Sequence, residues 1–490
     1  MHTSEPVWQD PVAAAYAASR RSAWDEVARE RATAPKKLHQ HYLAYLQRLY
    51  GFLIPSGSRV LELGCGDGQL LAALKPSFGV GVDFSPVMIE QARKAHPELH
   101  FMECDAQLLE PDMAPELLKE PFDAIILSDL INDAWDVHTL LTACRRFCAP
   151  HTRVFVNFHS WLWEHPFKFL MKLRLVSSRL EQNWITPGDM RSMFSLAGFR
   201  VISEYDEYLC PFRIPFLETI CNRYLAKIWP FSLFDLFHVQ VARPAPESAT
   251  QPSVSVVVPA RNEAGNIEAA ILRTPELGSG TELIFVEGNS SDDTWQVIQE
   301  MVAKYPDRRI KALRQPGKGK GDAVRAGFDA ADGDILMILD ADLTMPPETL
   351  PQFYEPLASG EAEFVNGVRL VYPQEKEAMR FCNLVGNKFF SLVFSWLLGR
   401  RIKDTLCGTK AMSRENYQRL AANRLYFGDF DPFGDFDLLF GAAKLNLELC
   451  DVPVRYRERT YGSTNISRWR DGWILLKMTA YAARRIKFVP

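Results

Sequence analysis

A stretch rich in proline, alanine, serine and threonine, RPAPESATQPS at residues 243–253, divides this sequence in two. On each side of it, short apolar segments alternate with amphipathic ones, and the pattern starts anew after the stretch. Short strands that alternate with helices predict a mostly parallel sheet covered by helices. The stretch itself lacks apolar periodicity and is typical of a linker. We therefore expect two α/β domains, at residues 1–243 and 254–490, joined by a linker at 244–253.

Length and composition agree with two soluble domains. The 490 residues exceed one ordinary core, and 47% hydrophobic with 24% charged residues is usual for globular proteins. The formal net charge of −4 argues against a nucleic-acid binder. The nine cysteines form no CxxC pair and residues 1–10 lack the features of a signal peptide, so we expect a reduced, cytoplasmic chain.

In the first half, a predicted strand at residues 59–63 runs directly into the glycine-rich loop GCGDG at residues 64–68. Glycines at this point allow a tight turn and a close approach of backbone N–H groups to a ligand. The next two predicted strands end in acids, at Asp83 and Asp105, and a fourth ends near Asp129. An acid after the second strand is placed to accept hydrogen bonds from ribose hydroxyls. The combination indicates a cofactor site.

From about Leu38 to Arg243 this pattern resembles the class I S-adenosylmethionine-dependent methyltransferases, which implies a Rossmann-like sheet. The resemblance implies three groups of cofactor-binding residues: the methionine-side loop of Glu62, Gly64, Gly66 and Gly68, the ribose ligand Asp83, and the adenine-flanking pair Asp105 and Ala106. A nicotinamide dinucleotide domain is the alternative. An acid two residues before the first glycine favours the methyl donor.

The methyl acceptor is less evident. Polar and aromatic residues follow the predicted fourth and fifth strands, where open α/β sheets bind ligands: Asp129, Asn132, Asp133, Asn157, His159, Trp161 and Trp163. His159 is either a general base or an ordinary loop histidine. A domain that binds the cofactor without catalysis is a further alternative.

In the second half, acids follow three predicted strands, and a glycine-rich turn, GKGKG at residues 317–321, carries two lysines. The last of these acids form the D-x-D pair Asp340 and Asp342. Hard divalent cations prefer oxygen ligands and bridge carboxylate to phosphate. Carboxylates beside a lysine therefore indicate a site for a nucleotide diphosphate with Mg²⁺ or Mn²⁺.

From Ser253 almost to the C-terminus, six such segments resemble, in order, the family 2 glycosyltransferases. More narrowly, they look like dolichyl-phosphate mannosyltransferase and the bacterial polyprenyl-phosphate glycosyltransferases. The resemblance implies a GT-A fold, with Asp342 as the first choice for a direct metal ligand and Asp340 contacting ribose or the metal. The implied nucleotide-sugar-binding residues are Pro259, Ala260, Asn262, Glu263, Glu287, Lys320, Asp340, Arg369 and Lys410.

Further positions fit the same resemblance, and two depart from it. One family segment is matched by Asp404, Cys407, Gly408 and Lys410. The resemblance implies that the acids Asp435 and Asp437 lie beside the acceptor. It also implies that Arg459 takes a catalytic arginine position. Gly288 replaces a second base-contacting acid. Asn465 replaces a phosphate-binding lysine, for which we expect Arg468 or Arg470 to substitute.

Two segments predict contact with a membrane surface. Residues 389–399, FFSLVFSWLLG, form either a buried or an interfacial helix, and the chain from Arg455 onward has nine basic and two acidic residues. We expect a peripheral, bifunctional enzyme that transfers a sugar from a nucleotide sugar to a polyprenyl phosphate with inversion and methylates a glycan or lipid-linked acceptor. The alternative is a transferase acting on a soluble glycan, with a non-catalytic, cofactor-binding first domain.

Overall fold

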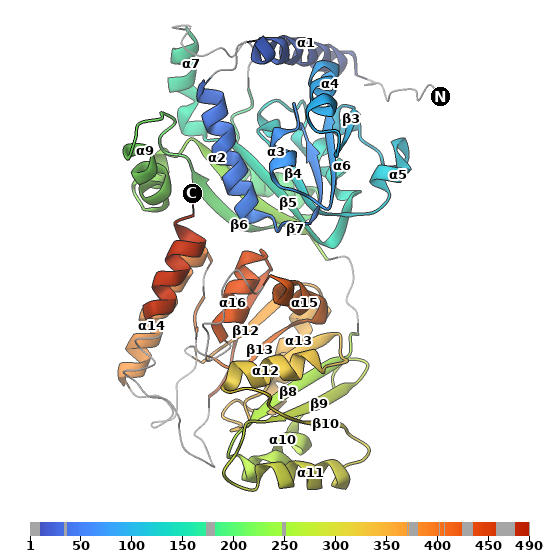
Figure 1. Ribbon diagram of the computed structural model, residues 1–490, viewed down its shortest axis with the longest axis vertical. Coiled ribbons are helices and arrows are strands. Elements are labelled where there is room, and N and C mark those ends of the chain that lie inside the picture. The colour runs from blue at the N-terminus through green and yellow to red at the C-terminus, as the bar shows by residue number, and fades with distance from the viewer. Residues whose placement is uncertain are drawn as a thin grey trace. The chain divides into compact units, whose positions relative to one another are not determined.

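The chain folds into two compact units, residues 1–245 with 487–490 and residues 246–486, each of which is described by itself (Figure 1). The computed structural model describes residues 10–33, 37–172, 182–246, 251–369, 371, 381–400, 402–405, 407–423, 435–456 and 476–489.

The first unit is built on a seven-stranded sheet in the order β3-β2-β1-β4-β5-β7-β6. The first five strands of this order are parallel, and β7 runs antiparallel to both of its neighbours. The strands are β1 (Arg59–Leu63), β2 (Phe78–Asp83), β3 (His100–Glu103), β4 (Phe122–Ser128), β5 (Cys148–His159), β6 (Phe199–Glu207) and β7 (Phe237–Pro244). The helices are α1 (Pro11–Thr33), α2 (Lys37–Leu53), α3 (Gln69–Ala73), α4 (Pro86–Ala95), α5 (Pro115–Leu118), α6 (Val137–Arg145), α7 (Glu164–Lys172), α8 (Pro187–Leu196) and α9 (Leu217–Thr219).

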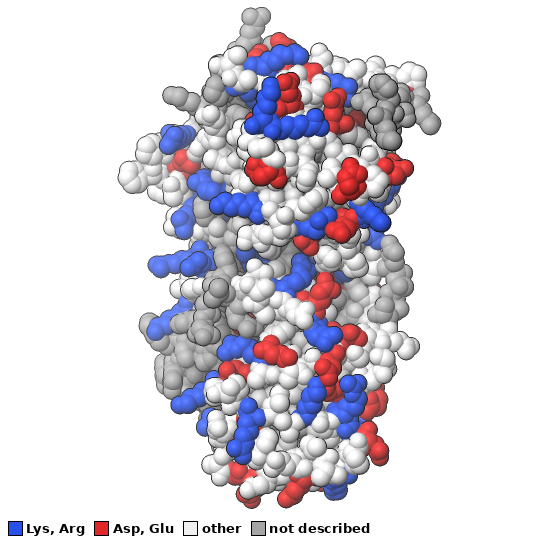
Figure 2. Space-filling model, turned by 45° about the vertical axis from the view of Figure 1, so that its right-hand side comes forward, with Lys and Arg blue, Asp and Glu red and all other residues white. Residues whose placement is uncertain are grey.

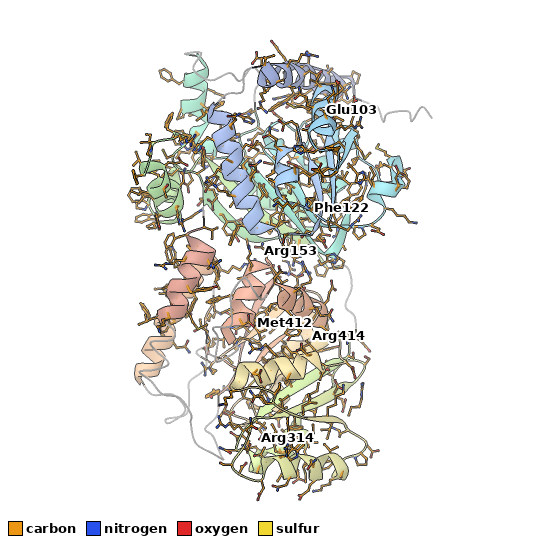
Figure 3. The ribbon with its side chains drawn as sticks, viewed as in Figure 1. Glu103, Phe122, Arg153, Arg314, Met412 and Arg414 are labelled. Atoms are coloured by element: carbon orange, nitrogen blue, oxygen red, sulfur yellow. The ribbon has the colours of Figure 1, made fainter. Side chains whose placement is uncertain are left out.

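The sequence explains why these elements form. Parallel strands are covered on both faces, so β1 and β4 are almost continuously buried. Helix α4 begins sharply because Ser85 accepts a hydrogen bond from the N–H of Met88 and Pro86 occupies the first turn. Figure 3 labels Glu103, the last residue of β3, and Phe122, the first residue of β4, at opposite edges of this sheet. The carboxyl edge, marked by Glu103, is the edge nearer to α1.

The second unit has a seven-stranded sheet in the order β10-β9-β8-β11-β13-β12-β14, in which β13 is antiparallel to its neighbours. The strands are β8 (Val254–Ala260), β9 (Thr281–Glu287), β10 (Arg309–Arg314), β11 (Ile335–Ile338), β12 (Phe364–Val368), β13 (Lys410–Ser413) and β14 (Leu449–Pro453). The helices are α10 (Ile267–Arg273), α11 (Thr294–Lys304), α12 (Lys320–Asp329), α13 (Leu350–Ala358), α14 (Phe381–Leu398), α15 (Arg414–Ala422) and α16 (Asp435–Lys444).

Two landmarks define the edges of the second sheet. Arg314 is the last residue of β10 and marks the carboxyl edge, whereas the N–H of Arg414 bonds to Asp334 just before β11 begins (Figure 3). Met412 of β13 is 1% exposed and lies in the core that α12, α14 and α16 share with the sheet. The glycine-rich and acidic turns predicted from the sequence follow the carboxyl ends of β8, β9 and β10 and the end of β11.

The prediction of two α/β domains is confirmed, but the linker starts later than composition indicates. Pro244, which composition assigns to the linker, is the last residue of β7 and pairs with Phe199 of β6. Strand pairing therefore sets this boundary, because a residue paired in a sheet belongs to the domain whatever its linker-like composition.

Of the two segments expected at a membrane surface, residues 389–398 and 476–487 are helical. Helix α14 buries Phe394 and Leu397 while Leu392 and Trp396 stay exposed, so one helix has both a core face and an exposed apolar face. Residues 476–487 are helical, and Met478 is buried in the core of the second unit. Among the described helices, none has the length and apolarity required to cross a membrane.

Candidate active sites

The glycine-rich loop of the first unit turns tightly at the carboxyl end of β1. Gly64, Gly66 and Gly68 all have positive φ, and the N–H of Gly64 bonds to the carbonyl of Val82 at 2.7 Å. Glycine is required at position 68, because its φ is 77° and an added Cβ would lie 2.7 Å from the Phe101 ring. The loop thus lies against β2 with its backbone free to approach a ligand.

Asp83 joins this loop to the end of β2. Its carboxylate accepts hydrogen bonds from the N–H of Gly66 and the N–H of Ser85, both at 2.9 Å. Burial raises the pKa of Asp83 to about 6, although those backbone hydrogen bonds oppose the rise. The carboxylate is therefore held in one orientation at the carboxyl edge, where a ribose would be bound.

The other predicted cofactor residues gather around the same edge. One pocket is lined by Gly64, Asp83, Asp105 and Ala106. Strand β3 ends at Glu103, two residues earlier than the sequence suggests, and the Asp105 carboxylate caps the following turn through the N–H of Gln107 at 3.0 Å. Glu62 is buried in β1, and burial raises its pKa well above the usual value. The donor set, two acids and a glycine turn around a partly apolar pocket, fits an adenosine-type cofactor.

Helix α1 also contributes to this pocket, which the sequence analysis missed. Tyr16 and Arg20 line the pocket. Arg20 pairs with Asp133 at 2.5 Å, and the Trp24 indole donates to the same carboxylate at 3.0 Å. The sequence does contain a pattern that could have indicated this contribution. Arg20, Trp24 and Arg31 are spaced by four and seven residues, which brings their side chains to one face of a helix.

On the acceptor side, Asp129 is the centre of a buried hydrogen-bond network. Its carboxylate accepts from the Tyr42 hydroxyl at 2.9 Å and from the Asn157 amide at 2.6 Å, and Tyr50 donates to Asn157 at 2.6 Å. Burial raises the pKa of Asp129, whereas His159 and these donors oppose the rise. Asp129 has a φ of 56°, a strained conformation for a residue other than glycine that often marks functional sites.

The hydrogen bonds of Asn132 select the tautomer of the neutral His159 ring. The Asn132 amide nitrogen donates to the carbonyl of Asn183 at 2.8 Å, so its oxygen faces His159. That oxygen accepts from the His159 backbone N–H at 3.2 Å and lies 3.1 Å from Nδ1. Because an amide oxygen only accepts, Nδ1 carries the proton and Nε2 of the neutral ring keeps its lone pair. This arrangement is the one a general base requires.

The two tryptophans that follow β5 are placed differently. Trp161 is more than half exposed, and the Trp163 indole donates to the carbonyl of Phe234 at 3.1 Å. Neither makes a described hydrogen bond to the Asp129 network, so the structure does not bring them together with His159.

In the second unit, the first predicted nucleotide turn follows β8, whose last two residues are Pro259 and Ala260. Asn262 has a φ of 57°, and its side-chain oxygen accepts from the N–H of Ser291 at 2.8 Å. Glu263 is buried and accepts from Asn266 at 2.7 Å. These bonds tie the turn after β8 to the loop after β9.

Glu287 ends β9 beside that turn. It is 5% exposed and accepts a hydrogen bond from the N–H of Ser290 at 2.5 Å. The N–H of Gly288 bonds to the carbonyl of Ala260 at 2.8 Å. A side chain at position 288 would press on Gln315, with the added Cβ 3.1 Å from its amide oxygen. A residue with a side chain at position 288 would therefore require Gln315 to shift.

The D-x-D pair lies just after β11, and its first acid is surrounded by positive charge. Lys320, the first residue of α12, pairs with Asp340 at 2.5 Å. Burial raises the pKa of Asp340, but Lys320, followed by Lys410 and Arg369, outweighs burial and holds the pKa below its usual value. Gly408 makes room for this pair, since an added Cβ would lie 2.9 Å from Asp340 Cγ and closer still to Lys320 Nζ.

The second acid, Asp342, has a different environment. Its carboxylate accepts from the Thr344 N–H at 3.1 Å and hydroxyl at 2.8 Å. Tyr456 lies close enough for the Asp342 charge to act on it. Burial and then this charge raise the pKa of Tyr456, while a hydrogen bond with Thr344 opposes the rise. No local pattern in the sequence indicated Tyr456.

Arg369 and Asp404 form a buried ion pair behind the D-x-D turn. The guanidinium donates to both carboxylate oxygens, at 2.8 and 3.0 Å, and the Arg369 N–H donates at 3.1 Å. Asp404 also accepts from Asn387 at 3.0 Å, and the Arg369 guanidinium lies 5.3 Å from the Tyr456 ring centre. This pair fixes Arg369 in a position from which its charge reaches Asp340.

The remaining predicted residues are described in part. Lys410 is buried at the start of β13 and its ammonium bonds to the carbonyl of Cys407. Asp437 is buried in α16, which begins at Asp435, a residue whose side chain lies outside the described part of the chain. Arg459, Asn465, Arg468 and Arg470 also lie outside the described residues. Among the residues that are described, no cluster of three metal-ligating side chains is present.

Comparison with known families assigns one match to each unit. Residues 34–204 match the family described as a methyltransferase domain, and residues 255–420 match glycosyl transferase family 2. The crystal structure of magnesium protoporphyrin IX methyltransferase from Synechocystis covers 47% of this chain and 100% of its own, with 15% identity and a TM-score of 0.33. Glucosyl-3-phosphoglycerate synthase from Mycobacterium tuberculosis covers 49% of this chain and 81% of its own, with 24% identity and a TM-score of 0.34.

Curated relatives match the second unit. The dolichol-phosphate mannosyltransferase of Pyrococcus furiosus is 33% identical over 248 residues, which are 48% of this chain and 67% of that protein. The undecaprenyl-phosphate 4-deoxy-4-formamido-L-arabinose transferase of Pectobacterium carotovorum is 36% identical over 219 residues, which are 44% of this chain and 63% of that protein. The chain spans only 36% of the Haloferax volcanii glycosyltransferase AglD, at 29% identity. The chain therefore belongs to glycosyl transferase family 2 through its second unit, which has a GT-A-like fold, and carries a Rossmann-like methyltransferase domain as its first unit.

Proposed function

We propose that this chain is a bifunctional transferase. The second unit transfers a sugar from a nucleotide sugar to a polyprenyl phosphate with inversion, and the first transfers a methyl group from S-adenosylmethionine to a glycan or lipid-linked acceptor. The acceptor proposal is supported by the relatives named for dolichol phosphate and undecaprenyl phosphate. Lys, Arg, Asp and Glu are interspersed over much of the face drawn in Figure 2.

The observation that carries the sugar-transfer proposal is the positive charge around Asp340. Lys320 pairs with this acid, and Lys410 and Arg369 act on its pKa. A diphosphate leaving group departs with growing negative charge, which preorganised cations stabilise. These three side chains are therefore suited to hold a nucleotide diphosphate and to promote its departure.

Asp342 fits a metal ion better than Asp340 does. Asp340 already faces Lys320 at 2.5 Å, whereas the Asp342 carboxylate is oriented by the Thr344 hydroxyl and N–H. One or two carboxylates suffice when phosphate oxygens complete the coordination of a hard cation, so Asp342 can serve with or without Asp340. When bound, Mg²⁺ or Mn²⁺ would neutralise charge on the diphosphate.

The acceptor of the second unit needs little deprotonation if it is a phosphate, which is already anionic near neutral pH. Asp437 would then position the acceptor and Asp435 would share that role. The face of α14 supports a membrane location, because Leu392 and Trp396 are exposed beside a groove that Lys388 and Lys403 help to line. A basic, apolar groove suits a phosphate on a hydrocarbon chain.

In the first unit, we assign His159 as the base that takes the acceptor proton at Nε2. S-adenosylmethionine supplies the methyl group as an electrophile when bound. Asn132 holds the ring by Nδ1, and the nearby carboxylates of Asp129 and Asp133 interact favourably with a charged His159. The chain thus has a way to accept a proton and to stabilise the imidazolium that forms.

A transfer assay tests the second unit. Full-length protein is incubated with a panel of nucleotide sugars, polyprenyl phosphate and Mg²⁺, and the release of nucleoside diphosphate is measured. Asp342→Ala should lower release about a hundredfold or more. The control Asp307→Ala, at an exposed acid of the same unit, should leave it unchanged. Full activity of Asp342→Ala would refute the site assignment.

A second assay separates catalysis from sensing in the first unit. Calorimetry with S-adenosylmethionine should show binding to wild type and, unchanged, to His159→Gln. Methyl transfer to lipid-linked glycans should occur with wild type and fall about a hundredfold in the variant. Binding without transfer to any acceptor would favour a regulatory module instead.

A further inference from the structure

A segment of the first unit exposes far more apolar surface than a soluble domain requires. From Phe212 to Phe234, between β6 and β7, eleven large apolar side chains are exposed, including Phe212, Phe216, Trp229 and Leu233. Phe216 is 86% and Trp229 is 75% exposed. Contiguous apolar patches on soluble proteins mark interaction sites. We call residues 212–234 the apolar segment.

The apolar segment is fixed in place, so its exposure is not that of a loose loop. Asn222, itself buried, accepts from the N–H of Cys210 at 2.7 Å and donates to the Cys210 carbonyl at 2.8 Å. Arg223 donates to the carbonyl of Phe488 at 3.0 Å, and Trp163 donates to the carbonyl of Phe234 at 3.1 Å. The backbone is held from inside while the large side chains face outward.

In the apolar segment a basic side chain is exposed, whereas the acidic one is not. Arg213 is exposed, whereas Glu218 is partly buried and lies 3.1 Å from His41. Asp235, the next acid along the chain, is buried, and burial followed by Glu207 raises its pKa to about 9, which leaves it uncharged. Exposed aromatic and aliphatic side chains with basic but no exposed acidic partners complement an anionic lipid surface.

The apolar surface continues toward the acceptor side of the unit. The N–H of Ser160, which directly follows His159, bonds to the carbonyl of Leu236 at 2.9 Å. Trp161 and, on α7, Phe169 are both more than half exposed. Figure 1 shows α7 and α9 at the same side of the unit. A membrane that received the apolar segment would therefore lie near the end of β5.

We propose that the apolar segment inserts into the interface of an anionic lipid bilayer and seats the methyltransferase unit on the membrane. Tryptophan and phenylalanine enter the boundary between headgroups and acyl chains, and Arg213 contacts headgroup phosphates. This docking surface belongs to the first unit and does not depend on α14 or on the sugar acceptor of the second unit.

Co-flotation with lipid vesicles tests the proposal on the full chain. Wild type is compared with the double variant Phe216→Ser with Trp229→Ser, using phosphatidylcholine vesicles with and without phosphatidylglycerol. Leu196→Ser is the matched control, because Leu196 on α8 is 76% exposed in the same unit but lies outside the apolar segment. Wild type should float with the anionic vesicles, the double variant should lose about tenfold or more of its partitioning, and Leu196→Ser should behave as wild type.

Unchanged binding of S-adenosylmethionine by the double variant shows that its fold is intact. Unchanged release of nucleoside diphosphate by this variant in detergent shows that the substitutions do not affect the second unit, so failure of the docking surface can be told apart from failure of the sugar-transfer proposal. Three results would overturn the docking surface. The first is that wild type fails to float with the vesicles, and the second is that the double variant floats as well as wild type. The third is that sedimentation detects a dimer of wild type that the two substitutions abolish, while vesicles bind neither protein.

Discussion

Replacing Asp404 with asparagine should destabilise the second unit by about 3–5 kcal/mol, because it leaves the Arg369 guanidinium buried without its counter-charge. The Asp404 carboxylate is 0% exposed and accepts four described hydrogen bonds at 2.8–3.1 Å, three from Arg369 and one from Asn387. An asparagine retains the shape, but one carboxylate oxygen becomes an NH₂ group that faces N–H donors.

The pKa of Asp404 gives an independent magnitude. Burial raises this pKa, but the Arg369 charge and the hydrogen bonds outweigh burial and hold it at about 2, against 3.8 for an unperturbed aspartate. That gap corresponds to about 2.5 kcal/mol at about 1.4 kcal/mol per pH unit. Since the folded-state pKa is depressed, this stabilisation is present above about pH 4 and is lost as the pH falls toward 2. The substitution should cost more, because it also strands the arginine.

Thermal unfolding of the full chain measures the effect. At about 2–4 °C per kcal/mol for a unit of this size, Asp404→Asn should lower the Tm of the second unit by about 6–20 °C. The transition that S-adenosylmethionine shifts identifies the first unit and should not move. The double variant Arg369→Met with Asp404→Leu removes both charges and should recover most of the stability, but not sugar transfer. A loss below about 1 kcal/mol for Asp404→Asn, or a double variant as unstable as the single one, would refute the reasoning.

Two further predictions concern ligand binding. Burial raises the pKa of Asp83 to about 6. The stability conferred by its neutral form is therefore complete below about pH 4 and is lost as the pH rises through 6. Affinity for S-adenosylmethionine should instead increase over about pH 5–7, because the carboxylate ionises in this range. Calorimetry across this range should show the increase in wild type and a flat profile in Asp83→Asn; a wild-type profile without slope would contradict it. Gly408→Ala should weaken nucleotide-sugar binding about tenfold, because the new methyl group pushes Lys320 and Asp340 apart. Gly386→Ala, whose Cβ would meet nothing within 4 Å, is the control, and equal affinities for the two variants would count against the role given to the pair.

The elements that the sequence predicted well are those that local patterns determine. The turn of Gly64 to Gly68 directly follows the buried strand β1, the acid Asp83 ends β2, and parallel strands bring their carboxyl ends to one edge. The same reasoning located Lys320 and the D-x-D pair. Local patterns also misjudged ends, as at β3, because hydrogen bonds to neighbouring strands decide where a strand stops.

Contacts between distant positions left no such pattern. Arg20 and Trp24 reach Asp133 from 113 and 109 positions away, and their helix preceded the region that resembled a methyltransferase. Tyr456 lies beside Arg369 because β14 pairs with β12, and the Asp342 charge acts on Tyr456 although β11 and β14 are not neighbours in the sheet. Exposure is equally non-local, since an aromatic such as Phe216 is compatible with a core until the fold shows that the described residues leave it 86% exposed.

Nucleotide-sugar binding with and without a divalent ion tests the central claim. This claim is that Asp342 binds the metal ion and that the cations around Asp340 bind the diphosphate. A panel of nucleotide sugars is added to wild type and to Asp342→Ala in EDTA, Mg²⁺ or Mn²⁺, and the Tm of the second unit is followed. A ligand that binds only the folded state raises its stability by mass action. We predict a donor that raises the Tm of wild type only with the metal and leaves Asp342→Ala unshifted. Equal shifts in both proteins, or no shift with any donor and metal, would contradict the account.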